Sequence, residues 1–437
     1  MRQRMHLTIV TVFWLLAMAT PGVGQRQQPG RPIREFLVLP QEPPSAVQAI
    51  VGVRLIDGKN NSPLEGANVI ISGGRISAVG PTASTAPPRE AEIIDAAGLT
   101  LLPGLMDSHF HLDGDGALPA LFLSHGVTSV RDPGAWIEAY DSVRRSKEVQ
   151  PRLFLAGPHL DCPPPAYPQD SLIVRDPLEA QIAANRLIES GASVIKVYFR
   201  LPVHLIRTIA ETAHAQGVPV TAHLEIVDAR DAIRVGIDGI EHVTSVGSSL
   251  LPPREGEAYR QLVLADNAAR SLGRYRVWSQ IDLKSERVDR LLKLMASRNV
   301  SLSATLAVFE RRNGDTDITE MHVRGFQQMM AFVGLAKRAG VRVVTGSHSS
   351  VPHAERGWAY QREMELLVES GLTPMQSIQA STLANAQFFR VDHRLGSIEA
   401  GKQADLVLVE GDPSKDIKAM RRVKRVMING AWVNLNR

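Results

Sequence analysis

Leu101-Leu-Pro-Gly-Leu-Met-Asp-Ser-His109-Phe-His111 is an apolar run that ends in two histidines two residues apart. In a β-strand, residues i and i+2 point to the same face, so His109 and His111 are expected to aim together beyond the strand's end. Imidazole nitrogen binds zinc-like metals at about 2.0–2.1 Å. The stretch predicts a strand leading into a metal site if other strands supply more ligands; two incidental histidines are the alternative.

The middle of the chain alternates apolar strands with amphipathic segments. Glycines such as Gly191 and Gly340 follow helical patterns just before the next strand, where C-terminal helix caps belong. Eight strands separated by helices predict a parallel (β/α)₈ barrel. A long, poorly patterned segment at 248–280 is expected to cap the barrel mouth as a loop. The candidate strands are Leu101–Met106, Val127–Arg131, Arg152–Ala156, Ser193–Tyr198, Val218–Ala222, Gly239–His242, Val300–Thr305 and Val341–Thr345.

Short strands also flank this middle region. Val69-Ile-Ile-Ser and Arg75-Ile-Ser-Ala-Val surround Gly73-Gly74, and Arg425-Val-Met-Ile precedes Asn429-Gly430. Both patterns predict hairpins, because glycine and Asn-Gly supply the positive φ of tight turns. The two ends are therefore expected to pair into one small β-domain, with the barrel inserted between them.

Histidines occur at four of the predicted strand ends, and a lysine lies in a further strand. Besides His109 and His111, Lys196 lies in the fourth strand, His223 and His242 end the fifth and sixth, and His348 follows the eighth. In such barrels, catalytic groups project from the carboxyl ends of the strands. Each histidine alone could be a hydrogen-bonded core or loop residue, but together they predict a metal site on one face.

Lys196 stands inside an apolar Val-Ile-Lys-Val strand, where an ammonium is costly to bury unless it is neutralised or paired. One interpretation is a salt-bridged lysine or one whose amine reaches solvent. The other is that the amine reacts with CO₂ to form a carbamate. That product is an anionic bidentate ligand able to bridge two metals.

The chain of 437 residues has ordinary globular composition, a net charge of +4 and one cysteine, Cys162, which excludes an intramolecular disulfide. Basic residues are scattered, and no nucleic-acid motif is present. Met1-Arg-Gln-Arg, the apolar Leu7–Ala19 and a small-residue site ending at Ala19 or Gly24 predict a secretory signal peptide. The apolar run is short of the ~20 residues of a membrane span, so no stable membrane anchor is expected after processing. We expect an exported protein, periplasmic or extracellular.

These observations divide the chain into five parts. They are a signal peptide at 1–24, a flexible leader at 25–47, the N-terminal part of the small β-domain at 48–103, the barrel with its predicted metal site at 104–392 and the C-terminal part of the β-domain at 393–437.

Several motifs of this sequence together resemble those of the amidohydrolase superfamily, in its imidazolonepropionase-like and Xaa-Pro dipeptidase (prolidase)-like branch. The resemblance covers nearly everything after residue 48. The motifs that carry it are Pro103-Gly-Leu-Met-Asp-Ser-His-Phe-His-Leu112, Val127-Thr-Ser-Val-Arg-Asp132, Ile195-Lys-Val197, Val220-Thr-Ala-His223, Gly239-Ile-Glu-His242 and Gly396-Ser-Ile-Glu-Ala-Gly-Lys-Gln-Ala-Asp-Leu-Val407.

The resemblance implies a (β/α)₈ TIM barrel with a composite β-sandwich built from both termini. It also implies one or two divalent metal ions, with zinc the expected metal. In that arrangement His109 and His111 bind one ion, carboxylated Lys196 bridges, and His223 and His242 bind the second.

One position departs from the family's pattern. Such enzymes usually end strand eight in Gly-Thr-Asp, where the aspartate binds metal and takes a proton from the attacking water, whereas this chain has Gly346-Ser-His348. Neutral histidine in place of aspartate raises the inner charge of a two-metal site from about +1 to about +2, which makes two metals harder to hold. Histidine can still act as ligand and base. Glu225 or Glu355 could supply a carboxylate; surface solvation is the alternative for each.

Two residues just past Lys196, Tyr198 and Arg200, are candidates for holding a substrate carboxylate, because arginine suits a planar anion. A surface arginine is the alternative for Arg200. Arg131 and Asp132 are expected to form a structural ion pair in the second strand.

The leading hypothesis is a metal-dependent hydrolase that cleaves C–N amide bonds in dipeptides or N-acyl amino acids. The metal would polarise the carbonyl and lower the pKa of water towards about 7, and His348, with His242, would handle the proton. One rival is a deaminase or cyclic-amide hydrolase on the same scaffold. Another is a catalytically impaired barrel that binds a ligand or a structural metal. Substrate, metal number and any homo-oligomer stay open.

Overall fold

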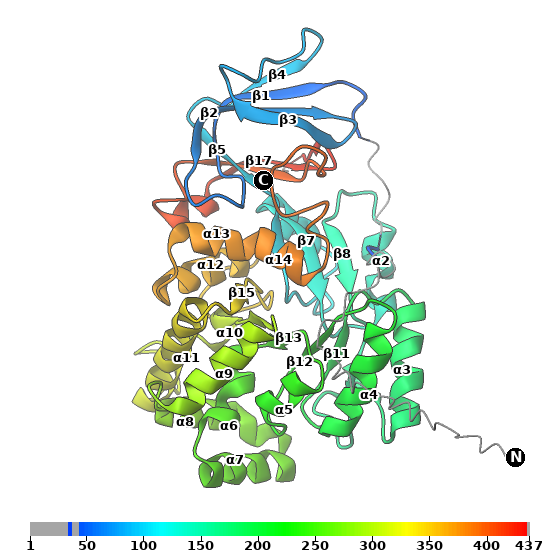
Figure 1. Ribbon diagram of the computed structural model, residues 1–437, viewed down its shortest axis with the longest axis vertical. Coiled ribbons are helices and arrows are strands. Elements are labelled where there is room, and N and C mark those ends of the chain that lie inside the picture. Colours follow the sequence, from blue (N-terminus) through cyan, green and yellow to red (C-terminus); the bar gives the residue numbers. More distant parts are fainter. Residues whose placement is uncertain (1–33, 37–42, 435–437) are drawn as a thin grey trace, which may run out of the picture.

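The computed structural model describes residues 34–36 and 43–434 (Figure 1). The predicted signal peptide and most of the predicted leader lie outside the described residues. Within the described ranges, no helix combines the length and apolar character needed to cross a bilayer.

Ten parallel-paired strands form two sheets in the middle of the chain. A three-stranded sheet has the order β6-β7-β8, and a seven-stranded sheet has the order β10-β9-β11-β12-β13-β14-β15. All eight candidate strands have a counterpart here, whereas the pair β9 and β10 was not predicted. The bounds are β6 Leu105–Asp107, β7 Val127–Asp132, β8 Arg152–Leu155, β9 His159–Asp161, β10 Ser171–Ile173, β11 Ile195–Val197, β12 Val220–Ala222, β13 Gly239–Glu241, β14 Ser301–Ser303 and β15 Arg342–Val344.

Backbone hydrogen bonds connect these two sheets at both of their edges. Ser108 N donates to Thr345 O at 3.0 Å, next to the ends of β6 and β15. Ser193 N donates to Leu155 O at 2.8 Å, which joins β8 to the segment that enters β11. Because all the pairings within these sheets are parallel, the carboxyl ends of the strands lie on a common side.

The apolar run that was predicted as one strand is divided between two sheets. β5 (Leu99–Pro103) pairs antiparallel with β16 (Leu406–Glu410), whereas β6 pairs with β7. Gly104 separates them, and a Cβ there would lie only 2.1 Å from the Thr128 hydroxyl. The prediction of a single strand Leu101–Met106 was therefore wrong, because periodicity does not reveal a change of partner.

An eight-stranded sheet contains strands from both ends of the chain. Its order is β18-β17-β16-β5-β1-β2-β3, with β4 paired to β1. The predicted hairpins at Gly73-Gly74 and Asn429-Gly430 are present as β2–β3 and β17–β18. In Figure 1 this sheet lies at the top of the molecule, above helices α12–α14. The remaining bounds are β1 Gln48–Leu55, β2 Leu64–Ser72, β3 Arg75–Pro81, β4 Glu92–Asp95, β17 Val423–Ile428 and β18 Ala431–Trp432.

Helices connect the parallel strands, and several end at the predicted glycines: Gly191 and Gly340 both have positive φ. The segment 248–280 is largely helical, in α6, α7 and α8, and not the predicted loop. The helices are α1 Leu118–Ser124, α2 Asp141–Arg144, α3 Pro177–Glu189, α4 Val203–His214, α5 Ala229–Arg234, α6 Gly247–Leu250, α7 Pro253–Ala265, α8 Arg270–Gln280, α9 Glu286–Ser297, α10 Leu306–Phe309, α11 Glu320–Arg338, α12 Ala359–Glu369, α13 Pro374–Ser381 and α14 Leu383–Phe388.

Residues 34–36 of the predicted leader contact the folded chain. The Glu35 carboxylate lies 2.7 Å from Arg152 Nη1 and 2.6 Å from an Arg394 nitrogen. Phe36 N donates to Leu153 O at 2.9 Å. This part of the leader is thus attached to β8.

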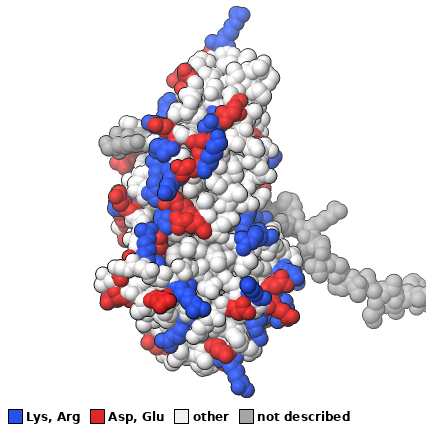
Figure 2. All heavy atoms as spheres, turned by 90° about the vertical axis from the view of Figure 1, so that its left-hand side faces the viewer, with Lys and Arg blue, Asp and Glu red and all other residues white. Residues whose placement is uncertain are grey.

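The surface carries both signs of charge. On the face drawn in Figure 2, lysine and arginine side chains are interspersed with aspartate and glutamate. This mixture agrees with the small net charge of +4.

Candidate metal centre

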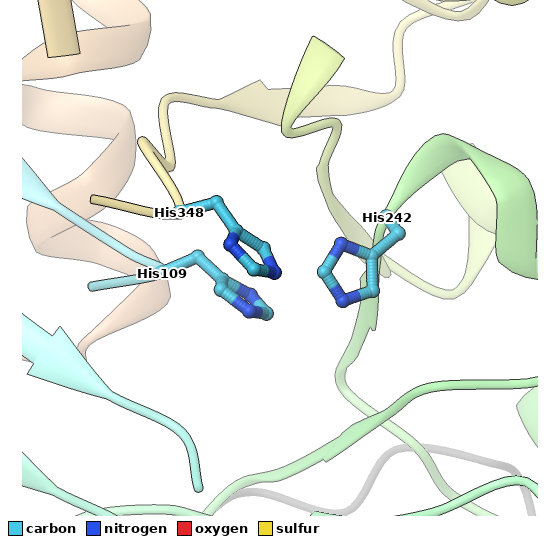
Figure 3. A group of neighbouring side chains, drawn as sticks. All are labelled: His109, His242 and His348. Atoms are coloured by element: carbon cyan, nitrogen blue, oxygen red, sulfur yellow. The ribbon is translucent and has the colours of Figure 1, made fainter. Parts of the chain in front are cut away.

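Three histidines from three strand ends converge at the carboxyl side of the parallel strands. His109 follows β6, His242 follows β13 and His348 follows β15. One ring nitrogen from each lies within 4.8 Å of the other two. Figure 3 shows the His109 and His348 rings side by side, with His242 facing them.

His109 and His111 point to the same place, as predicted from their spacing. Their Nε2 atoms are 3.1 Å apart. Two nitrogens bound to one tetrahedral ion at about 2.0–2.1 Å are about 3.3 Å apart, so this distance fits two ligands of one metal. His109 Nδ1 is 2.7 Å from Glu241 Oε2, and since a carboxylate only accepts, Nδ1 carries the proton and Nε2 keeps its lone pair.

His242 and His348 are held by unusual backbone conformations. Their φ values are 68° and 61°, and Thr305, next to His242, has φ 47°. Left-handed φ is strained for residues other than glycine and is often found at functional sites. The Thr305 hydroxyl lies 2.7 Å from His242 Nδ1, which leaves Nε2 directed to the cluster.

The histidines of this cluster are held in their neutral form. Burial lowers the pKa of His109 and of His348 to about 3 and that of His242 well below its usual range. Neutral imidazole is the form that binds a metal ion. The nitrogen spacing and this protonation state both fit a nitrogen-ligated divalent ion.

Lys196 lies beside the histidines in β11, and 3% of the residue is exposed. Among the described residues, no hydrogen bond or ion pair involves its amine. Burial lowers the pKa of Lys196 to about 8, and Glu241 opposes this shift. The described residues thus give Lys196 no salt bridge, which leaves an amine that reaches the cavity, or its carbamate, as the remaining interpretations.

His223 has a different partner from the other predicted ligands. Its Nε2 lies 3.0 Å from Arg274 Nη2, and Arg274 Nε donates to Glu225 Oε1 at 2.6 Å. Glu225 is buried rather than on the surface, and it also accepts from the Tyr259 hydroxyl at 2.7 Å. Glu355, by contrast, is exposed.

The histidines line a cavity of about 710 Å³. Aromatic side chains contribute to its wall, among them Trp136, Tyr167, Tyr198 and Phe309. The predicted site residues in the wall are His109, His111, Lys196, Tyr198, His223, His242 and His348. The structure thus brings together all of the predicted site residues except Arg200.

Arg200 does not line this cavity. Its guanidinium donates to Asn267 Oδ1 at 2.8 Å and to the carbonyl oxygens of Val263 and Leu264. These contacts hold the end of α7, so the structure gives Arg200 a structural position in place of the predicted substrate contact.

The predicted ion pair between Arg131 and Asp132 is also absent from the described chain. Arg131 Nη2 instead donates to Glu241 Oε1 at 2.9 Å. Asp132 accepts from the backbone N–H groups of Gly134 and Ala135. Neighbouring strand residues point to opposite faces, which explains why the two side chains do not meet.

Among the polar residues at the site that sequence reasoning missed are Glu241, Arg274 and His159. Glu241 accepts from His109, Arg131 and Thr221. A glutamate inside the apolar strand Gly239-Ile-Glu-His242 was a usable signal. Arg274 lies in the poorly patterned segment, and His159 lies in the unpredicted strand β9.

The profile of the amidohydrolase family matches residues 100–433. An ochratoxinase from Aspergillus niger is 24% identical over 465 residues, which cover 90% of this chain and 87% of that protein. An adenine deaminase from Mesorhizobium japonicum is 23% identical over 363 residues, covering 82% of this chain. The chain spans about half the length of that deaminase, 52%.

Solved structures share the fold. A Xaa-Pro dipeptidase with bound methionine superposes with a TM-score of 0.68 at 22% identity, covering 89% of this chain and 99% of that chain. The A. niger ochratoxinase structure gives 0.69 at 22% identity, covering 89% and 95%.

These likenesses give the chain a TIM-barrel-type α/β fold, in agreement with the alternating parallel strands and helices. The family profile extends over most of the sequence and includes every histidine of the cluster. The chain therefore belongs to the amidohydrolase family.

Proposed function

We propose that this protein is a metal-dependent hydrolase of C–N amide bonds, with dipeptides or N-acyl amino acids as substrates. The observation that carries the proposal is the group of closely spaced neutral imidazoles, with 3.1 Å between the Nε2 atoms of His109 and His111, at the wall of a 710 Å³ cavity. Family membership supports the same class of reaction.

His109, His111, His242 and His348 would hold the ion, for which zinc is the proposed identity. When bound, a divalent ion supplies Lewis-acid polarisation of the amide carbonyl and activation of water. Glu241 orients His109, and Thr305 orients His242. Such partners fix the tautomer of a ligand, so the chain prepares the imidazole nitrogens before an ion binds.

Lys196 is proposed to be carboxylated. Its unprotonated amine would attack the carbon of CO₂, forming a C–N bond and releasing a proton. The pKa of Lys196, lowered to about 8 by burial, makes the reactive free amine more abundant at neutral pH. The carbamate would give the cluster an anionic ligand that it otherwise lacks.

His348 is the proposed proton carrier, with His242 beside it. Their rings are 5.5 Å apart, and His348 also lies 4.7 Å from the His111 ring. Burial lowers the pKa of His348 and so keeps its imidazole unprotonated, the form that a general base requires. A neutral imidazole has one lone pair for either a metal or a proton, so His348 would act as the base only when His109, His111 and His242 hold the ion without it. It would then take a proton from the attacking water and pass it to the leaving nitrogen.

Tyr198 is the proposed contact for the substrate's carboxylate. Arg270 Nη1 donates to the Tyr198 oxygen at 3.2 Å, so the phenolic proton is free to be donated to an anion in the cavity. Tyr198→Phe is expected to raise KM for a dipeptide with a free carboxylate. The same variant should change KM little for the matching dipeptide amide.

The test of the proposed activity is turnover of a panel of dipeptides and N-acyl amino acids by metal-loaded protein. Release of amino acids well above that of His109→Ala supports the proposal. Turnover equal to that of the variant, across the whole panel and with metal bound, contradicts it and favours a barrel that binds ligand without catalysis.

A deaminase is the second candidate, because curated relatives over most of this chain are named adenine deaminases. Adding adenine to the same panel distinguishes a deaminase from an amide hydrolase. Release of ammonia from adenine, without release of amino acids from any peptide, would favour deamination.

We further propose that the two parallel sheets are parts of one closed barrel, supported by the hydrogen bonds from Ser108 to Thr345 and from Ser193 to Leu155. The eight-stranded sheet would then be the core of the composite β-sandwich. Export through the N-terminal signal, to the periplasm or the exterior, completes the proposal and rests on the sequence at 1–24.

A further inference from the structure

We propose that the Arg274 guanidinium takes the place of a second metal ion, so that this centre holds one ion per chain. The inference rests on the proposed function, since it requires that the histidine cluster binds metal at all. It concerns His223, whose assignment to a second ion came from the family resemblance alone.

The contact between Arg274 and His223 leaves neither nitrogen of His223 free for a metal. A guanidinium has only donors, so at 3.0 Å Arg274 Nη2 donates and His223 Nε2 accepts. The proton of the neutral ring is then on Nδ1.

A competing contact to Nε2 is weaker. Glu225 Oε1 lies 3.4 Å from His223 Nε2, but the same oxygen already accepts from Arg274 Nε at 2.6 Å. The shorter distance to Arg274 Nη2 decides the direction of the hydrogen bond.

Arg274 is firmly fixed in this position. It extends from the middle of α8, and its side chain is 15% exposed, whereas that of Glu225 is 1% exposed. Tyr259 from α7 donates to the other oxygen of Glu225. An ion pair supported by a further hydrogen bond is the arrangement in which a buried charge pair is stable.

The charges around the cavity favour one ion. A second divalent ion would add two positive charges next to a guanidinium that is already present. Glu225 is paired with Arg274, and Glu241 accepts from His109, Arg131 and Thr221. Neutral His348 supplies no compensating charge, and the proposed Lys196 carbamate carries one negative charge, which is half the charge of a single divalent ion. Asp113, Asp132 and Asp170 also line the cavity, but the carboxylate in contact with Arg274 beside His223 is Glu225. Next to His223, the guanidinium paired with Glu225 is therefore locally balanced, whereas an added divalent ion would not be.

The first test is the metal content of the full-length protein after loading with Zn²⁺ or Mn²⁺ and removal of excess ion. We expect one ion per chain, and isolated Mn²⁺ in electron paramagnetic resonance. Two ions, with spin-coupled Mn²⁺, would overturn this inference and leave the proposed function standing. No ion would overturn the proposed function itself.

The second test removes the guanidinium. Arg274→Met frees both His223 and the Glu225 carboxylate, so the variant is expected to bind two ions, and adding His223→Ala should return it to one. Arg274→Lys keeps a positive charge and should stay at one. Arg276→Met, an exposed arginine on the same helix, is the matched control. A folded Arg274→Met protein that still binds one ion would contradict the role of Arg274. If that variant does not fold, the metal content of the wild-type protein decides the stoichiometry.

Discussion

His109 Nδ1 and Glu241 Oε2 lie 2.7 Å apart, and both side chains are almost completely buried. Burial alone would raise the pKa of Glu241, but the positive charges of Lys196 and Arg131 and the hydrogen bond from His109 lower it below its usual range. Glu241 is thus an ionised acceptor that fixes the tautomer and direction of a proposed metal ligand without touching the metal.

Glu241→Gln should weaken metal binding by about 10–100-fold, the usual cost of losing a partner behind a ligand. The amide would be able to donate to His109 as well as accept, so Nδ1 would no longer be held as a donor. Competition with a chelator measures the affinity. The control is Glu355→Gln, at an exposed carboxylate. An equal loss of metal affinity in both variants would contradict a specific role of Glu241 in supporting His109.

Lys196→Ala should lose metal and activity, with partial rescue by short carboxylic acids that replace the carbamate. Metal content with and without added acetate is the measurement, and Lys418→Ala, at an exposed lysine, is the control. Full metal occupancy in Lys196→Ala would refute a ligand role for this residue. Carbamate formation can be observed directly by ¹³C NMR after exchange with ¹³CO₂.

His348→Ala should reduce the rate by about 10²–10⁴-fold, the contribution of a general base. His348→Asp should retain or raise metal content and activity, because it restores a negative charge among neutral ligands. Rate and bound metal are measured together for both variants. An unchanged rate in His348→Ala would show that the proton is carried elsewhere.

Glu363 gives a prediction about pH and stability. It is buried and accepts from the backbone N–H groups of Leu306 and Ala307 at the start of α10, and burial raises its pKa to about 8. The folded state therefore keeps a proton that the unfolded chain releases above its ordinary pKa of 4.5. This contribution to stability is present below that value and is lost as pH rises to about 8.

Glu363→Gln cannot release that proton, so its thermal stability should fall less than that of the wild type between pH 5 and pH 8. The difference in Tm between the two proteins, measured across this range, is the observable. A difference that does not change with pH would mean that Glu363 ionises in the folded protein as it does in the unfolded chain.

The mature protein is expected to begin just after residue 19 or 24, because a basic start, an apolar run and small residues occur in the order of a signal peptide. N-terminal sequencing of the native protein checks this. Intact Met1 on protein from the cytoplasmic fraction would rule out processing.

The parallel strands and the histidines at their ends could be predicted because both depend on local patterns. A buried strand is recognised as an apolar run. A histidine just past its carboxyl end projects to the face where the other strands also end. For this reason the prediction that His109, His242 and His348 lie close together was confirmed. The predictions failed where a residue depends on a distant partner: Arg200 was chosen for its closeness in sequence to Lys196, but α7 supplies its acceptors.

Arg274 is a site residue that could not be predicted, because its partners are also distant in sequence. It lies in a helix whose apolar residues face several neighbours, so no single periodicity marks the segment 248–280 as helical. Its contacts with Glu225 and His223 join residues about 50 positions away, at separations of 49 and 51. Only the folded chain reveals them.

The pairing of β5 with β16 has a consequence for how the protein is made. β5 precedes the parallel strands and β16 follows them, so these two strands cannot pair until the region between them has been made. Contacts so distant in sequence slow folding, because a long loop must close first. The edge of β5 that β16 covers would therefore stay unpaired while the intervening residues are made. An exposed apolar strand edge makes binding by a chaperone before folding is complete an advantage.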